Sequence, residues 1–265
     1  MKRIVNGLIR ETKKELRYLI TNPKPILFDH LPKCGGTTIN WYLESVFPRR
    51  FVYEISGENP LEAVEKFKDL PKGIRLKSKV IYGHLANELI DYANPESLVV
   101  TVLRDPVSRI VSHYHYVKAN KNHYLHHKIK EGKIRLDNYC YQNLSSELEN
   151  WYVSHFSKMS ISQINRDPDK AIKLALKNIK DKYHIIGFQD DITSFVNELA
   201  HLANLKNKFQ NQILNGRKKK SKSKELDQAT YDLICEKNSL DIELYNQLIF
   251  LRESKKSKVV IFKGV

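Results

Sequence analysis

Residues 26–47 constrain the fold most, because they indicate a buried strand, a glycine turn and a helix in direct succession. Residues 26–28 form a short apolar run after two prolines, which suits a central parallel strand. Residues 31–38 form the turn, with the sequence Leu-Pro-Lys-Cys-Gly-Gly-Thr-Thr. The next apolar residues recur at the spacing of one helical face: Ile39, Leu43, Val46 and Phe47.

This strand-to-helix turn predicts an anion site. A helix start leaves backbone N–H groups unpaired and carries the positive end of the helix dipole. The glycines allow the main chain to approach a ligand closely, the threonines add hydroxyl donors and the lysine adds a positive charge. We expect a phosphate group here. The candidate binding residues are Lys33, Cys34, Gly35, Gly36, Thr37 and Thr38.

A second strand-to-helix junction follows residues 98–103, the strongest strand pattern in the sequence. Asp105 suits an N-cap and Pro106 suits the first helical position, so a helix is expected to begin at once. Ser108 and Ser112 would share one face of that helix, with Arg104 at its start. The junction therefore presents cationic and hydroxyl donors.

Between these junctions, residues 79–84 indicate another strand that ends at Gly83 and His84. Ligands of open parallel sheets bind outside the carboxyl ends of the strands, where His84 would lie. A neutral imidazole can accept a hydroxyl proton near pH 7. His84 is therefore the best candidate for a general base.

The order of the glycine turn differs from the common nucleotide-binding loop, in which lysine follows the last glycine. The strand-Pro-Lys-x-Gly-Gly-Thr-Thr-helix run resembles the 5′-phosphosulfate loop of sulfotransferases that use 3′-phosphoadenosine 5′-phosphosulfate (PAPS). Residues 104–114 resemble the 3′-phosphate segment of the same enzymes. Together with the Gly-His strand end, they resemble the heparan sulfate 2-O-sulfotransferase-like, or uronosyl, branch of the carbohydrate sulfotransferases.

The resemblance implies an α/β fold, a P-loop-like three-layer sandwich whose central, mainly parallel sheet is flanked by helices. It implies sulfuryl transfer from PAPS to a glycan hydroxyl, with 3′-phosphoadenosine 5′-phosphate (PAP) as product and no metal. His84 would be the catalytic base and Lys33 would lie by the bridging oxygen of the donor. Arg104 and Ser112 would bind the 3′-phosphate, and a basic loop would add Arg217 and Lys218. Candidate acceptor-binding residues are Arg109 and His115.

The charge balance favours a polyanionic partner, since 45 Lys and Arg against 30 Asp and Glu give a net charge of +15. An acidic glycan fits this charge. Two alternatives are a P-loop-type phosphotransferase and a nucleic-acid-binding protein. The position of Lys33 argues against the first, and two matched phosphate sites are not explained by the second. We therefore expect no nucleic-acid partner.

The N-terminal residues 1–22 predict a basic amphipathic helix, packed on the domain or, alternatively, in peripheral contact with a membrane surface. Residues 23–265 are expected to form a single sulfotransferase domain. The pattern predicts no signal peptide and no transmembrane segment. Cys34, Cys140 and Cys235 are far apart and suit reduced thiols, so we expect a cytoplasmic protein.

The remaining pattern predicts strands at 51–55 and 183–188, and a strand or tail at 259–262. Helices are predicted at 60–70, from 168 to about 179, at 191–202 and at 226–251. Residues 113–133 are rich in histidine, tyrosine and lysine, without a metal-ligand pattern. They suit either a groove for an acidic sugar chain or a solvated helix and loop.

Overall fold

The computed structural model describes residues 2–55, 59–130, 134–140, 144–205 and 226–262. Contacts between Cα atoms divide the chain into two compact units. Unit 1 comprises Met1–Leu103, Lys182–Leu214 and Lys258–Val265, and unit 2 comprises Arg104–Asp181 and Asn215–Ser257. The assignment of residues 23–265 to one domain stays a prediction.

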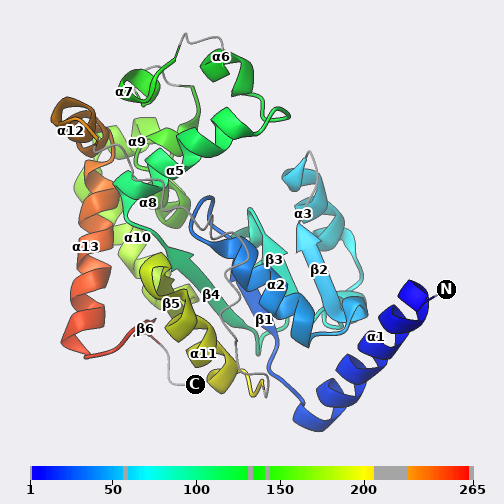
Figure 1. Cartoon of the computed structure of the whole chain (residues 1–265). Helices are drawn as coiled ribbons and strands as arrows, with labels where there is room; N and C mark the ends of the chain where they lie inside the picture. Colours follow the sequence, from blue (N-terminus) through cyan, green and yellow to red (C-terminus); the bar gives the residue numbers. More distant parts are fainter. Residues whose placement is uncertain (1, 56–58, 131–133, 141–143, 206–225, 263–265) are drawn as a thin grey trace. The chain divides into compact units, whose positions relative to one another are not determined.

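Unit 1 contains a six-stranded sheet with the order β2-β3-β1-β4-β5-β6 (Figure 1). The first five strands run parallel to their neighbours, and β6 pairs with β5 in the antiparallel direction. Every residue of β1, β3, β4 and β5 is buried, as continuous apolar runs predict. The strands are β1 (Ile26–Asp29), β2 (Val52–Ile55), β3 (Val80–Gly83), β4 (Leu98–Leu103), β5 (Ile185–Phe188) and β6 (Val260–Ile261). This mostly parallel sheet flanked by helices confirms the predicted α/β class.

The helices of unit 1 pack around a core formed by alternate residues of the strands. Ile39 and Leu43 of α2 and Phe195 and Leu199 of α11 belong to one hydrophobic cluster with the strand residues. The helices are α1 (Lys2–Thr21), α2 (Gly36–Val46), α3 (Pro60–Asp69), α4 (Lys72–Arg75) and α11 (Ile192–Leu202), with 3-10 turns η1 (Arg49–Phe51), η2 (Ala86–Leu89) and η4 (Gln189–Asp191).

Unit 2 is helical over its described residues and has a separate core, which includes Val107 and Ile110 of α5 and Ile234 of α12. Its helices are α5 (Pro106–Ala119), α6 (His126–Lys130), α7 (Leu136–Tyr139), η3 (Ser146–Leu148), α8 (Trp151–Ser157), α9 (Ile161–Arg166), α10 (Pro168–Lys182), α12 (Gln228–Lys237) and α13 (Ser239–Ser254). The last residue of α10 falls in unit 1.

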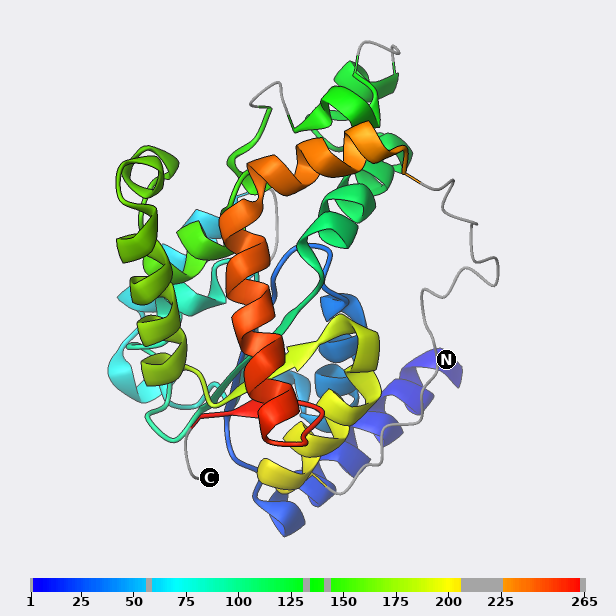
Figure 2. The same ribbon diagram turned by 90° about the vertical axis from the view of Figure 1, so that its left-hand side faces the viewer.

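The single helix predicted over residues 226–251 is wrong, because the chain forms α12 and α13 with a bend at Asn238 (Figure 2). The Asn238 side chain is fully buried. Its Nδ2 donates to the carbonyl oxygens of Leu148 and Ile234, each at 3.1 Å. The apolar periodicity continues across the bend, so the sequence pattern gives no indication of this tertiary contact.

Helix α1 occupies the predicted N-terminal position and packs on the rest of unit 1. The Tyr18 ring lies 6.2 Å from the Phe47 ring and 4.6 Å from the Phe51 ring, measured between centroids. Glu15 pairs with Arg50 at 2.5 Å. The helix therefore packs on the domain, which is the first of the two placements that the sequence predicts. Within the described residues, no helix combines the length and apolar character needed to cross a bilayer.

Candidate active site

The glycine turn of unit 1 connects the buried strand β1 directly to α2. Gly35 is the N-cap residue of α2 and has the left-handed backbone conformation, with φ 89°. It has no side chain to cap the helix, so no side-chain hydrogen bond covers the first turn. Lys33 also has a positive φ of 65°, which turns the chain back towards the helix start. The amides of this first turn are thus suited to an external anion.

Close approaches require glycine at both positions, and the left-handed backbone conformation also requires it at Gly35. A Cβ atom at Gly36 would lie 2.0 Å from Cδ2 of His30. A Cβ atom at Gly35 would lie 2.5 Å from Cδ1 of Ile192, which belongs to α11. The turn therefore fits tightly between the His30 ring and α11, and its shape suits a phosphate cradle made of main chain.

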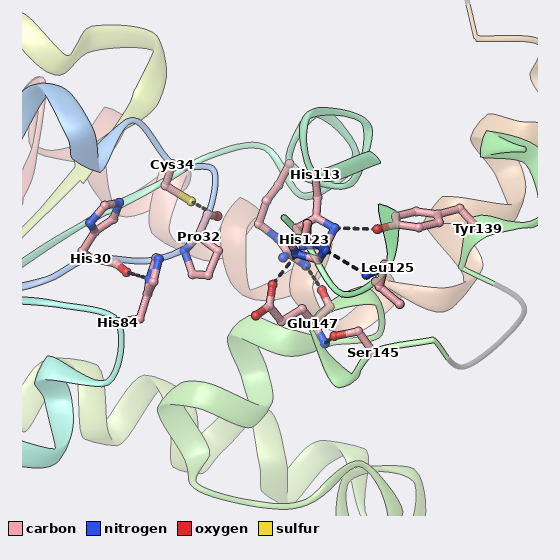
Figure 3. Close-up of polar contacts among 11 residues, drawn as sticks. His30, Pro32, Cys34, His84, His113, His123, Leu125, Tyr139, Ser145 and Glu147 are labelled. Carbon is pink, nitrogen blue, oxygen red and sulfur yellow. Dashed lines mark hydrogen bonds and ion pairs between the residues drawn. The ribbon is translucent and has the colours of Figure 1, made fainter. Parts of the chain in front are cut away.

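His84 follows β3 at the same sheet edge. Gly83, the last residue of β3, pairs with Asp29, the last residue of β1. Its φ of 138° and the 2.3 Å that would separate a Cβ atom from the Ile55 carbonyl oxygen require glycine there. The next residue, His84, is exposed and lies beside His30, with ring centroids 4.7 Å apart (Figure 3).

The hydrogen bond of His84 determines which ring nitrogen can act as a base. Nδ1 lies 2.7 Å from the carbonyl oxygen of His30 (Figure 3). A carbonyl oxygen only accepts, so Nδ1 carries the proton and donates it. In the neutral ring, Nε2 then has the lone pair, and it can take a proton from a hydroxyl group.

His30 is a candidate site residue that the sequence interpretation missed. Its ring contacts His84, and Asn40 Nδ2 lies 3.3 Å from its Nδ1. Burial, followed by the nearby charge of His84 and, more weakly, Lys33, lowers the pKa of His30 to about 3. His30 therefore stays neutral when His84 accepts a proton. Its position in the sequence could have indicated it, because His30 directly follows β1 just as His84 directly follows β3.

Arg104 is the first residue of unit 2 and directly follows β4 in the chain. Tyr152 of α8 holds its main chain, because the tyrosine hydroxyl accepts from Arg104 N at 3.2 Å and donates to Arg104 O at 2.9 Å. Two residues later α5 begins, and the Asp105 carboxylate accepts from Ser108 N at 2.8 Å. The predicted cap and proline at the start of this helix are confirmed.

Comparison with known proteins decides the family. A profile of the sulfotransferase family matches residues 16–247, which is most of the chain. The chain belongs to the sulfotransferase family. A search of curated proteins gives no match. The family assignment confirms the predicted sulfotransferase class, and both strand-to-helix junctions lie inside the matched range.

Arg109 of this sulfotransferase lies inside unit 2. Its side chain is fully buried, with the guanidinium carbon 5.4 Å from the Trp151 ring and 5.1 Å from the Tyr152 ring. Its Nη2 donates to the Glu147 carbonyl oxygen at 2.8 Å. In this conformation the side chain supports the interior of unit 2 and presents no surface to an acceptor. We therefore leave Arg109 out of the proposed acceptor site.

Asp241 provides the negative charge in this interior. Its carboxylate accepts from the amides of Tyr152 and Val153, each at 2.9 Å. In return, Asn150 Oδ1 accepts from the amide of Leu240 at 3.0 Å, so the starts of α8 and α13 cap each other. Burial raises the pKa of Asp241 to about 6, although the Arg109 charge and the amide bonds act in the opposite direction.

The histidine-rich segment is divided between the interior and the surface. His113 is buried, with Nδ1 2.8 Å from the Tyr139 hydroxyl and Nε2 3.2 Å from Glu147 Oε2 (Figure 3). His126 is also buried and donates to the Val117 carbonyl oxygen at 2.9 Å. His115 is exposed on α5. The segment therefore links helices of unit 2 and leaves only part of its residues to meet a ligand.

Two further site predictions concern Cys34 and the basic loop. Cys34 is buried, and its Sγ lies 3.4 Å from the Pro32 carbonyl oxygen, so the thiol supports the turn from inside. Arg217 and Lys218 lie outside the described residues. Among the described residues, no group of three His, Cys, Asp or Glu side chains is arranged to hold a metal ion.

Proposed function

We propose that the protein transfers a sulfuryl group from PAPS to a hydroxyl group of an acidic glycan. The family assignment supports sulfuryl transfer. The observation that carries the mechanism is the 2.7 Å hydrogen bond from His84 Nδ1 to the His30 carbonyl, next to the glycine turn. It leaves the His84 Nε2 lone pair available beside a main-chain anion site.

In the proposed reaction, the acceptor oxygen attacks sulfur as the bond between sulfur and the bridging oxygen breaks. The hydroxyl proton passes to His84 Nε2, and PAP leaves with the bridging oxygen. Lys33 stabilises the negative charge that grows on this oxygen. The turn amides, with Thr37 and Thr38, hold the 5′-phosphate. Because His30 stays neutral, it adds no second positive charge against the protonated His84.

The 3′-phosphate would distinguish this donor from ATP. We assign it to Arg104 and Ser112, with Arg217 and Lys218 as further cations. The main chain of Arg104 is held by the Tyr152 hydroxyl, which supports a defined start for its side chain. The Ser112 side chain is partly exposed on α5. These roles follow from the resemblance to the 3′-phosphate segment of the family.

The acceptor proposal rests on charge and on the resemblance to the uronosyl branch. A net charge of +15 favours a polyanion such as a uronic-acid polysaccharide. His115, exposed on α5, is the acceptor-side candidate that remains. The three cysteines are free thiols. This state is consistent with the proposed cytoplasmic location.

The test combines sulfate transfer with donor binding. Labelled PAPS and a panel of acidic and neutral glycans should give labelled acidic glycan with the wild-type protein. His84→Ala should lower turnover by about 10²- to 10⁴-fold, the usual contribution of a general base. PAP affinity measured by calorimetry should stay within about twofold. His201→Ala, an exposed histidine of α11, is the matched control and should leave both quantities unchanged.

Three outcomes would contradict the proposal. Near-normal turnover of His84→Ala would remove His84 from the role of base. Thermal stabilisation by ATP with magnesium, but not by PAP, would indicate a phosphotransferase. Stabilisation by oligonucleotides alone would indicate a nucleic-acid-binding protein.

A further inference from the structure

Helix α1 turns its apolar side away from the rest of unit 1. A helix that packs on a domain normally buries its apolar face. Among residues 7–21 of α1, the partly buried residues are Glu11, Lys14, Glu15, Tyr18 and Thr21, which lie towards the rest of unit 1. Five large apolar side chains are instead 48–74% exposed: Leu8, Ile9, Leu16, Leu19 and Ile20. Their spacing places them on one side of the helix.

The charges of α1 are also divided between its sides. Its two acidic residues, Glu11 and Glu15, are engaged on the side that packs on unit 1. Glu11 Oε1 lies 2.5 Å from Lys14 Nζ, its Oε2 accepts from Arg49 N at 3.2 Å, and Glu15 pairs with Arg50. Lys14 of the same helix thus neutralises Glu11 and Arg50 neutralises Glu15, so the two acidic residues add little negative charge at the apolar side.

A row of cations borders the exposed apolar side. Arg10, Lys13 and Arg17 are exposed and lie three or four residues apart, so they follow one line along the helix. At 100° per residue, this line lies next to Ile9 and Ile20. An apolar stripe with a cationic border matches a helix that lies in the interface of an anionic bilayer.

We propose that α1 binds the surface of a membrane that contains anionic lipids. Its five exposed apolar side chains enter the boundary between headgroups and acyl chains, and the cationic row contacts the lipid phosphates. The charge favours this occupant over a second copy of the chain, because a second copy brings the same cations and neutralises none of them. Tyr18 and the Glu15–Arg50 pair keep the helix attached to unit 1 in this arrangement.

The apolar part is tested by cosedimentation of the full chain with vesicles of phosphatidylcholine, with and without phosphatidylglycerol. Leu16→Ser/Leu19→Ser/Ile20→Ser should weaken binding to the anionic vesicles by more than about 30-fold. The matched control is Leu61→Ser/Ile74→Ser, two exposed apolar residues of α3 and α4, which should bind as the wild type does. Equal melting temperatures of both variants would show that the fold is retained.

The charged part is tested in the same assay. Arg10→Ser/Lys13→Ser should weaken binding to anionic vesicles by about 30-fold and should have little effect on neutral ones. Lys72→Ser/Lys77→Ser removes two exposed cations outside α1 and serves as the control. Binding of the wild type should also fall as salt is raised.

Three results would overturn the proposal. The wild type could fail to bind either kind of vesicle, or could bind neutral and anionic vesicles equally. Alternatively, light scattering could show a dimer that the three serine substitutions convert to a monomer, without any vesicle binding, and the stripe would then be an interface between copies. None of these results bears on sulfate transfer to a soluble glycan, so the proposed activity is tested separately.

Discussion

The starts of α2 in unit 1 and α5 in unit 2 are capped in opposite ways. Gly35 leaves α2 without a side-chain cap. At α5, Asp105 accepts from Ser108 N, and Pro106 has no N–H group to offer. An anion at α2 can therefore bind to the main chain, whereas the start of α5 already has a capping carboxylate and would offer an anion the side chains of Arg104 and Ser112. The two phosphates of PAPS would thus be recognised by different chemistry.

The interiors behind these two helix starts also differ. In unit 1 the turn lies against His30, a half-buried side chain that is kept neutral. In unit 2, the guanidinium of Arg109 and the carboxylate of Asp241 are both buried near α8. A tightly packed neutral side chain such as His30 is destabilised by small changes of shape next to it. A buried charge pair such as Arg109 and Asp241 is destabilised when one of the two charges is removed. Each of the following experiments acts on one side of this difference.

Loss of charge in unit 2 should have the largest effect. Asp241→Ala leaves Arg109 buried without its counter-charge and removes the cap of α8, so the free energy of unfolding should fall by about 3–5 kcal/mol. Urea unfolding measures this change. Glu243→Ala, an exposed carboxylate on the same helix, should cost less than about 0.5 kcal/mol. A small loss of unfolding free energy for Asp241→Ala would show that the charge of Asp241 does not stabilise unit 2.

A change of shape in unit 1 comes next. Gly36→Ala places a methyl group in the space of the His30 ring, 2.0 Å from Cδ2 before any relaxation. We expect a loss of about 1–3 kcal/mol in stability, together with weaker binding of PAP in calorimetry. Gly73→Ala is the control, because nothing lies within 4 Å of its added Cβ atom. Unchanged PAP binding in Gly36→Ala would separate the turn from the phosphate site.

His30 should make unit 1 sensitive to acid. The pKa of His30 is about 3 in the folded protein against 6.5 for the free side chain, so between these values the unfolded state binds the extra proton. Stability then rises with pH across this window. On lowering the pH from 7 to 5, the wild type should lose about 2 kcal/mol more than His30→Gln. Equal losses would show that His30 is not kept neutral.

Asp241 should change the stability with pH in the opposite direction to His30. Its pKa is about 6 in the folded protein and 3.8 for the free side chain, so the folded state binds the extra proton between pH 3.8 and 6. This contribution falls as the pH rises through that window. Comparison of His30→Gln with the wild type cancels it, because both proteins contain Asp241.

The smallest effect should come from the support of Arg104. Tyr152→Phe removes the hydroxyl that holds the Arg104 main chain, at a cost of about 1 kcal/mol in stability. PAP affinity should fall by about fivefold, while affinity for adenosine 5′-phosphosulfate, which lacks the 3′-phosphate, should stay the same. Tyr139→Phe, which loses only a bond to His113, is the matched control. Equal losses for both ligands would remove Arg104 from the 3′-phosphate.

Much of the fold could be predicted from local sequence signals. Apolar runs located β1, β3, β4 and β5, because central strands are buried on both faces, whereas the edge strand β2 is only partly buried. Asp105 and Pro106 located the start of α5 for an equally local reason. The Gly83-His84 pair located His84 at the carboxyl end of β3, next to the end of β1, because the register of the two parallel strands brings their ends together.

The remaining features depend on contacts between distant residues. The low pKa of His30 comes first from burial and then from the nearby charge of His84, and Gly36 lies against its ring. Arg109 looked like a surface cation of α5, but aromatic rings of α8 enclose it. The bend at Asn238 depends on a bond to Leu148, 90 residues away. None of these contacts leaves a local sequence pattern.

The most direct test of the proposed mechanism is the tautomer of His84 in the resting protein, measured by ¹⁵N NMR of the histidine rings. The His84→Gln variant identifies the signal. The account predicts a protonated Nδ1 and an unprotonated Nε2 for His84, and the opposite tautomer for His30, whose Nδ1 faces the Asn40 amide. A proton on Nε2 of neutral His84 would contradict it, because that nitrogen could not take the acceptor's proton.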